Sequence, residues 1–478
     1  MMTDEASPRE QSHILQWMSR PVDADLLVYF RIVFGFVALS WVLKQFTSGA
    51  IDHFYSGPKL HFHYHGFHWI QILPEPWTRI EFGILGVAAI LIVCGAFYRV
   101  GALAFAVGFT HLFLGDKTLY QNHYYLICLV SWLMVVLPAN CRLSFDAYWW
   151  PSIASSTVPS WAIWLLRFQL GVPYFFGGIA KINPDWLDGE PMRFMLSRQL
   201  NFPMVGQFFD QEWCVLLFAY GGLLFDLLVI PALVSKRFRT AACIIAVCFH
   251  TTNAWLFTIG VFPWFMLFSL PVFFEPSSIA RFWSRETTAP STRQHFTSFS
   301  TNAIGCLLAV YVGWQLLFPM RHFLMPGNPS WTEEGHYFAW HMLLRGKRSA
   351  LRYEAFDPKT NRAGAIDLRP YVTAFQLNRV ARDPRMIHEL AQNIGEDLRD
   401  RGFDDVRLHA ISLVSMNGRK PQMLVDPDVD LLRAEAGWQQ PKWIVPLHEP
   451  LRREYWSLPM SEWESALSKK PAPTEDGQ

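Results

Sequence analysis

Long apolar stretches recur along the first 320 residues of this 478-residue chain, and they constrain its fold more than any other feature. Each is close to the roughly 20 residues that a helix needs to cross the hydrocarbon core of a bilayer. We count nine such stretches: Leu26–Phe46, Ile80–Ala96, Val100–Leu114, Tyr124–Leu137, Trp161–Ile179, Trp213–Val234, Thr240–Phe257, Gly260–Phe274 and Phe299–Phe318. The sequence therefore predicts a mainly α protein, with a polytopic membrane domain of about nine transmembrane helices.

Composition agrees with a protein that lies largely among membrane lipids. Charged residues make up 17% of the chain, whereas soluble domains hold roughly 25%. The net charge of +1 gives no support for nucleic-acid binding. We therefore expect lipids as neighbours and no nucleic-acid partner, while the oligomeric state stays open.

Basic residues in the connections predict the orientation, because cytoplasmic loops carry an excess of Lys and Arg. The tightest basic clusters, Lys236–Arg239 and Arg281–Arg293, fall on one side, together with the N-terminal segment 1–25. That segment has several acidic side chains and no short apolar core, so a cleavable signal peptide is not expected. We predict an integral membrane protein with a cytoplasmic N-terminus and everything after Met320 outside.

The C-terminal part changes to a polar composition without apolar runs of membrane length. Asp383–Arg401 shows the apolar spacing of an amphipathic helix, and Val406–Val414 and Gln422–Asp426 read as strands. The sequence thus divides into a cytoplasmic segment 1–25, a transmembrane domain 26–320, a small extracytoplasmic α/β domain 321–468 and a disordered tail 469–478.

Lys181 ends the fifth apolar stretch, and Asn183-Pro184-Asp185 stops the helix directly after it. One interpretation is a lysine that snorkels to the membrane interface and anchors the helix. Gly177-Gly178, one turn earlier, would let another backbone approach closely. A lysine held in packed, poorly hydrated protein has a lowered pKa and can act as a base. The residues alone leave both interpretations open.

Polar side chains inside the apolar stretches are candidate functional or structural groups, because burying them in a membrane costs free energy. They are Arg31, Arg167, Asp226, His111, His123 and His250. Arg31 or Arg167 could form a structural ion pair with Asp226. The histidines could ligate haem, yet no pair has a clean spacing on one helix.

The run His61-Phe-His-Tyr-His65, with His68 nearby, resembles a metal-binding cluster. Alternation could place its ligands on one face, but no acidic residue or cysteine in the run completes a site. We interpret it as a structural, aromatic-rich outer loop and predict no metal.

Several separated motifs resemble those of the vitamin-K-dependent γ-glutamyl carboxylase family, including its bacterial members with a horizontally transferred transmembrane (HTTM) domain. The resemblance covers roughly residues 20 to 430. The motifs are Asp116–His123, Pro173–Glu190, Gly221–Asp226, Phe249–Asn253, Phe257–Trp264, Trp331–His336, Trp340–Leu344 and Val425–Pro427.

The resemblance implies a carboxylase driven by a hydroquinone. In the family, reduced vitamin K, O2 and CO2 convert glutamate in a peptide or protein to γ-carboxyglutamate, and the vitamin leaves as its epoxide. Phylloquinol and menaquinol are both suitable cofactors, and no metal is implied. A glutamate γ-proton is too weakly acidic for any side-chain base, so oxygenation of the quinol must supply the driving force.

The resemblance also implies roles for single residues. Lys181 matches the catalytic lysine of the family, and His123 with Asn122 matches a pair beside the quinol. His250 matches another histidine of the site. Asn253 and Trp186, from the same motifs, complete the expected substrate- and quinol-binding set.

Three alternatives remain. The first, suggested by bacterial relatives of the family, is a quinol epoxidase that does not carboxylate a peptide. The protein could also be a non-enzymatic membrane protein that binds quinone or lipid, with Lys181 as a helix anchor only. A haem-dependent quinol oxidoreductase is a third possibility.

Overall fold

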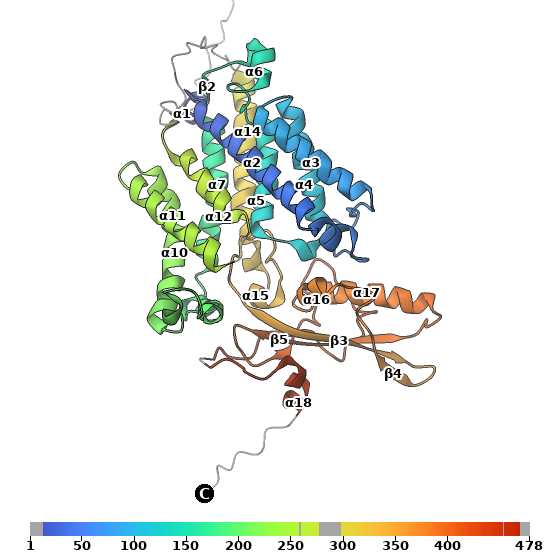
Figure 1. Cartoon of the computed structure of the whole chain (residues 1–478). Coiled ribbons are helices and arrows are strands. Elements are labelled where there is room, and N and C mark those ends of the chain that lie inside the picture. Colours follow the sequence, from blue (N-terminus) through green and yellow to red (C-terminus); the bar gives the residue numbers. More distant parts are fainter. Residues whose placement is uncertain (1–12, 258–259, 277–297, 453, 469–478) are drawn as a thin grey trace, which may run out of the picture.

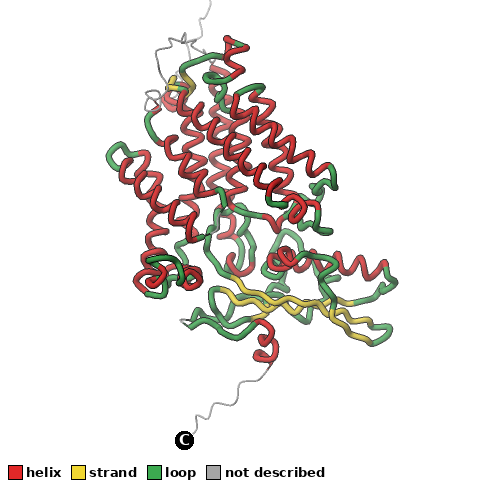
Figure 2. The backbone as a smooth tube through the Cα atoms, in the orientation of Figure 1, coloured by secondary structure: helices red, strands yellow, loops and turns green. Residues whose placement is uncertain are grey.

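A computed structural model describes residues 13–257, 260–276, 298–452 and 454–468. The expected disordered tail 469–478 and the first part of the expected cytoplasmic segment lie outside the described residues. Long helices stand side by side in a bundle, and a region with a β-sheet lies at one end of it (Figure 1). Figure 2 shows the same division, with the bundle almost entirely helical and the long strands confined to the C-terminal region.

The bundle contains every apolar stretch that the sequence singles out. Its helices are α1 (His13–Ser19), α2 (Asp25–Thr47), α3 (Trp77–Cys94), α4 (Tyr98–Gly115), α5 (Asn122–Val136), α6 (Phe145–Trp149), α7 (Ser160–Ala180), α8 (Pro184–Leu187), α9 (Met192–Leu196), α10 (Glu212–Val234), α11 (Arg239–Leu256), α12 (Phe262–Ser269) and α14 (Ser298–Leu317). Two short strands, β1 (Pro21–Asp23) and β2 (Thr157–Pro159), pair antiparallel at the end far from the main sheet.

Six helical segments among the described residues are long and apolar enough to cross a membrane. They are Asp25–Thr47, Trp77–Cys94, Tyr98–Gly115, Ser160–Ala180, Glu212–Val234 and Asn302–Leu324. Asn122–Val136 and Phe262–Phe273 are shorter apolar helices. The prediction of a polytopic helical membrane protein is confirmed, whereas nine crossings stay a prediction.

Helices α7 and α10 approach each other closely where α7 carries two glycines. A Cβ atom added to Gly178 would lie 2.6 Å from the Leu227 side chain, and one added to Gly177 would lie 3.2 Å from the Asp226 carboxylate. Larger residues at these positions would push the two helices apart. The glycine pair therefore has the close-packing role that the sequence indicates.

The predicted ion pair of Arg31 or Arg167 with Asp226 is wrong. Both guanidinium groups donate to main-chain carbonyls, which helix ends and loops leave without partners. The accepting carbonyls belong to Ala139 and Leu143 for Arg31, at 3.1 and 2.6 Å, and to Val272 and Phe274 for Arg167, at 2.8 and 2.6 Å. Asp226 instead contacts Lys181 across the α7–α10 interface.

The C-terminal region is built on an antiparallel sheet in the order β4-β3-β5-β6. Its elements are α15 (Pro329–Thr332), β3 (Lys347–Asp357), β4 (Arg362–Ala365), α16 (Ala374–Val380), α17 (Pro384–Asp400), β5 (Arg407–Met416), β6 (Gln422–Met423) and α18 (Trp463–Ser468). Strand β3 pairs with β5 from Lys347 opposite Met416 to Phe356 opposite Arg407. Helices α16 and α17 lie between the sheet and the bundle (Figure 1).

The expected secondary structure of this region is largely present. The predicted helix Asp383–Arg401 is α17, with the Asp383 side chain capping its first turn. The predicted strand Val406–Val414 is β5, and the strand expected over Gln422–Asp426 is shortened to β6.

Buried ion pairs join the C-terminal region to two loops of the bundle. Lys117, before α5, lies 2.9 Å from the Asp383 carboxylate. Asp185, after α7, accepts two hydrogen bonds of 2.7 Å from the Arg419 guanidinium and one of 2.8 Å from Asn417. These contacts hold the ends of α5 and α7 against the sheet region.

Candidate functional site

A cavity of about 410 Å³ lies at the end of the bundle that faces the C-terminal region. All the site residues expected from the sequence line it, as does one of the expected structural charges. The site residues are Asn122, His123, Lys181, Trp186, His250 and Asn253, and the structural charge is Asp226. Residues of α5, α8, α10 and α11, together with Lys181 directly after α7, therefore meet at one place although they lie far apart in the sequence.

Apolar side chains form much of the cavity wall. Phe218 and Phe249 belong to α10 and α11, and Phe262 opens α12. Met342 and Leu343 come from the C-terminal region and close the cavity on its side. Such a wall excludes water and suits a hydrophobic, aromatic ligand.

Lys181 directly follows the last residue of α7, and only 5% of it is exposed. Its Nζ donates to the Asp226 Oδ2 at 2.5 Å and lies 5.0 Å from the centre of the Trp186 ring. The amino group therefore lies in the cavity wall and does not extend to the outer surface. Its position favours a role in the site over that of an interfacial anchor.

His250 lies on α11 and is almost completely buried. Its Nε2 shares a hydrogen bond of 2.7 Å with the hydroxyl of Tyr174. Its Nδ1 is buried and has no hydrogen-bond partner among the described residues. A buried polar atom without a partner costs free energy, so this nitrogen is a candidate ligand-binding atom.

Tyr174 is a cavity residue that the sequence reasoning missed. It lies seven residues before Lys181 on α7, which is two helical turns and therefore the same face. The seven-residue spacing from Lys181 was the feature of the sequence that could have identified Tyr174. The tyrosine fixes the orientation of the His250 ring beside the lysine.

Asn122 and His123 open α5 but have different environments. The Asn122 amide donates to the main-chain oxygen of His341 at 2.9 Å and accepts from the Tyr120 hydroxyl at 2.9 Å. The His123 ring stacks on Phe262, with 5.8 Å between the ring centres, and makes no hydrogen bond within the described residues. Asn122 thus connects the bundle to the C-terminal region, whereas His123 keeps its ring nitrogens free.

Trp186 and Asn253 complete the set. Trp186, on α8, is 2% exposed and donates from its indole nitrogen to the Ala219 main-chain oxygen at 2.8 Å. Asn253 lies three residues after His250 on α11, so both face the cavity. Trp186 forms part of the wall beneath the lysine, and Asn253 adds an amide to it.

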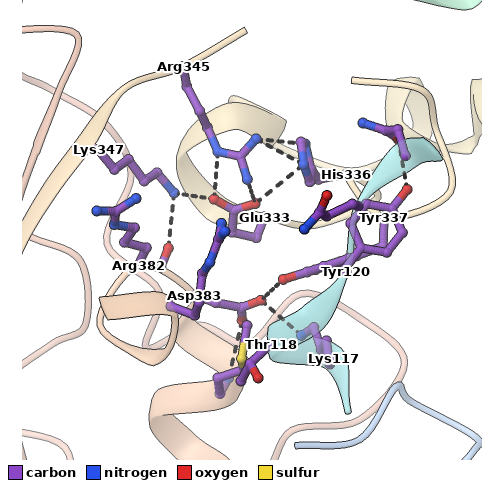
Figure 3. A pocket seen from close by; sticks show the side chains of 14 residues that line it. Lys117, Thr118, Tyr120, Glu333, His336, Tyr337, Arg345, Lys347, Arg382 and Asp383 are labelled. Atoms are coloured by element: carbon purple, nitrogen blue, oxygen red, sulfur yellow. Dashed lines mark hydrogen bonds and ion pairs between the residues drawn. The ribbon is translucent and has the colours of Figure 1, made fainter. Parts of the chain in front are cut away.

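A second, polar pocket of about 210 Å³ adjoins the cavity and shares Gln121, Asn122 and Arg379 with it. Figure 3 shows its cations and acids at close range. Glu333 contacts both Arg345 and Lys347, the latter at 2.6 Å, and Asp383 contacts Lys117.

Charges in this pocket are desolvated. Burial lowers the pKa of Lys347 to about 8, against the opposing effect of Glu333. Burial, with the neighbouring Arg345, also holds the pKa of His336 well below its usual value. The pKa of Arg382 falls to about 10 for the same reason, and its Nε has no partner among the described residues. The pocket is therefore suited to an anion.

Arg379 lies where the cavity and the polar pocket meet, on α16. Its guanidinium forms no ion pair or hydrogen bond with a described residue, and the central guanidinium carbon lies 5.5 Å from the centre of the Phe375 ring. The arginine remains accessible because its surface faces the two pockets. Sequence reasoning missed it, since α16 joins the site only through the folding of the C-terminal region.

Two family models match the chain. The model described as "HTTM domain" matches residues 19–277, more than half of the sequence. The model described as "Vitamin K-dependent gamma-carboxylase, lumenal domain" matches residues 300–450. No solved structure matches the chain significantly.

Proposed function

Because the chain belongs to the HTTM-domain family and continues into a vitamin K-dependent gamma-carboxylase lumenal domain, we propose that it is a hydroquinone-dependent γ-glutamyl carboxylase. The family resemblance indicated by the motifs is thereby confirmed. The observation that carries the proposal is the position of Lys181 beside His123 and His250 in one apolar cavity. The proposed substrates are a glutamate-containing peptide, O2, CO2 and reduced vitamin K, either phylloquinol or menaquinol.

The cavity residues fit a reduced quinone. A volume of about 410 Å³ lies within the range of small-molecule sites. Phe249 and Phe262 would contact a fused aromatic ring, and the unpaired His250 Nδ1 and the His123 ring would hydrogen bond to its oxygens. When bound, the hydroquinone supplies, on reaction with O2, a base strong enough to remove the glutamate γ-proton.

Lys181 would accept a proton from a ligand hydroxyl at Nζ. The ammonium so formed lies 2.5 Å from the Asp226 carboxylate, which offsets its charge where little water is present. Lys181 is thus the proposed catalytic base, and Asp226 is the residue that positions it. His123, with free ring nitrogens, would stabilise developing negative charge on the ligand oxygen.

Arg379 would bind the carboxylate of the glutamate side chain. It lies at the junction of the cavity and the polar pocket and forms no ion pair with an acidic side chain among the described residues. A guanidinium pairs with a carboxylate through two parallel hydrogen bonds, which would fix the orientation of the side chain. The apolar cavity and the polar pocket would therefore hold the two substrates side by side.

We further propose a cytoplasmic N-terminus in a bacterial inner membrane, a membrane domain over 26–320 and an extracytoplasmic domain over 321–468. The basic clusters on the opposite side of the membrane support this orientation. Protease added to intact spheroplasts should remove an epitope placed after residue 320. Protection of that epitope until lysis would contradict the orientation.

The central experiment uses purified protein with reduced vitamin K, O2, labelled bicarbonate and glutamate-rich peptides. Wild type should form both quinone epoxide and carboxylated peptide, and Lys181→Ala should form neither while still binding quinone. Epoxide without carboxylated peptide would identify a quinol epoxidase. Wild-type protein that binds quinone but forms no epoxide would contradict the proposal.

A further inference from the structure

We propose that His63, His68 and Glu389 form a Zn²⁺ site that ties the loop between α2 and α3 to helix α17. One potential ligand atom from each residue lies within 4.8 Å of the other two. This site is separate from the proposed quinol cavity, because none of the three residues lines it.

The missing acid of the histidine-rich loop comes from a distant part of the chain. No carboxylate or thiolate lies within His61–His65, and on that ground the sequence predicts no metal. Glu389 lies on α17, 326 residues after His63, and its Oε1 accepts a hydrogen bond of 3.0 Å from His63 Nδ1. Two imidazoles and a carboxylate form a common ligand set for zinc.

His63 Nδ1 and Glu389 Oε1 lie 3.0 Å apart, close to the spacing of about 3.4 Å between two ligands of one tetrahedral zinc ion. Zinc bound between these two atoms would take the place of the proton on Nδ1, which would be released to water. The ionised carboxylate has free lone pairs to bind the ion.

His68 can complete the cluster from the solvent side. It is exposed, its ring centre lies 5.6 Å from that of His63, and its ring makes no hydrogen bond with a described residue. Ligands of a tetrahedral zinc ion lie about 3.4 Å apart, given bond lengths of about 2.1 Å. Rotation of the exposed side chain would therefore bring the ligands to zinc geometry.

The ligand types select the metal. Magnesium and calcium prefer oxygen ligands, whereas two imidazoles favour zinc. Three protein ligands leave the fourth position to water.

What bound zinc would do depends on the parts of the molecule to which the histidine-rich loop and α17 are attached. His61 donates to the buried Asp116 carboxylate at 2.8 Å, which holds the loop to the bundle. Helix α17 follows α16, whose Arg379 reaches the cavity. Zinc would therefore fasten the C-terminal region beside the site, as a structural element without a part in the chemistry.

Metal content and affinity test the proposal on tag-free, full-length protein in detergent. After dialysis against micromolar Zn²⁺ and then metal-free buffer, wild type should retain about one zinc per chain. His68→Ala and Glu389→Gln should bind Zn²⁺ at least tenfold more weakly. His53→Ala, which removes an exposed histidine just before the loop, is the matched control and should bind like wild type.

Bound Co²⁺ provides a second measurement, because a tetrahedral site gives intense visible absorption. Wild type should show this absorption and His68→Ala should lack it. His68 is exposed, so its alanine variant should fold and insert normally. Absence of retained zinc in wild type, or equal affinity in wild type and His68→Ala, would overturn the proposal.

Discussion

Lys181 Nζ lies 2.5 Å from Asp226 Oδ2, and the two residues belong to helices that the Gly177–Gly178 pair brings together. Both side chains are at least nine-tenths buried. An ammonium formed on the buried Lys181 requires a counterion, and here the counterion lies across a helix interface. The pair therefore connects helix packing to the chemistry proposed for the cavity.

Replacement of Lys181 by Arg distinguishes a base from an anchor. A guanidinium keeps the positive charge beside Asp226 but stays protonated, so it cannot accept a proton. We expect normal expression and a loss of epoxidation by about 10²–10⁴-fold, measured under saturating quinol. A small amine added to Lys181→Ala should restore part of the activity. Near-normal turnover of Lys181→Arg would leave only the anchor interpretation.

Asp226→Asn keeps the size of the side chain and removes its charge. The ammonium formed on Lys181 would then lack its buried counterion, so epoxidation should fall by about 10–100-fold. Quinone binding, measured by fluorescence quenching, should change little because Asp226 acts through Lys181. Leu224→Ala, on the exposed face of α10, is the matched control and should retain activity. Epoxidation at the wild-type rate in Asp226→Asn would show that the Asp226 carboxylate takes no part in the reaction.

Arg379 offers a test that affects one substrate only. Arg379→Ala removes the proposed partner of the glutamate carboxylate, so KM for the peptide should rise by about 10–100-fold, as for other charged hydrogen bonds. Epoxidation assayed without peptide should stay within about twofold, because Lys181 and its surroundings are unchanged. Equal losses in both assays would show that Arg379 maintains the cavity as a whole.

Asp185 and Arg419 form a buried connection between the bundle and the sheet region. Asp185→Asn would leave the Arg419 charge buried without a counterion, at a cost of about 3–5 kcal/mol. We expect a clearly lower melting temperature of the detergent-solubilised protein. Asp367→Asn, in an exposed pair with Arg369, should change it little. Similar melting temperatures for both variants would contradict a stabilising role of the Asp185–Arg419 pair.

The pKa of Glu190 predicts how the stability of the folded protein depends on pH. Burial raises the pKa of Glu190 to about 7, although Tyr455 and Arg193 oppose the shift. The folded protein then holds a proton that the unfolded chain releases above about pH 4.5, so stability should fall as pH rises from about 5 to 7. Glu190→Gln cannot release a proton and should show a smaller decrease of melting temperature over that range. If the melting temperature falls equally with pH in wild type and Glu190→Gln, Glu190 is not the source of the pH dependence.

The apolar stretches predicted the bundle well because helices in a membrane satisfy their own backbone hydrogen bonds. The motifs also brought Lys181, His123 and His250 to notice, and the structure places all three at one cavity. Long β3 was not predicted, because its pairing with β5 joins strands some 50 residues apart. Local patterns do not report such pairings.

The sequence also did not predict which charged side chains lie next to each other in the folded protein. The sequence predicted Arg31 or Arg167 as the partner of Asp226, whereas the packing of α7 on α10 pairs it with Lys181. Arg379 carried no motif of its own. Its importance depends on the docking of α16 against the bundle, which no spacing within α16 encodes.

Asn122 begins α5 inside the cavity wall, and its amide donates to the main-chain oxygen of His341 in the C-terminal region. Met342 and Leu343, the next two residues, help to close the cavity. A strong base that meets bulk water is protonated before it reaches glutamate. On the proposed reaction, weakening this one hydrogen bond would therefore lower the coupling ratio, the number of glutamates carboxylated for each hydroquinone consumed, even where the rate of hydroquinone consumption is unchanged.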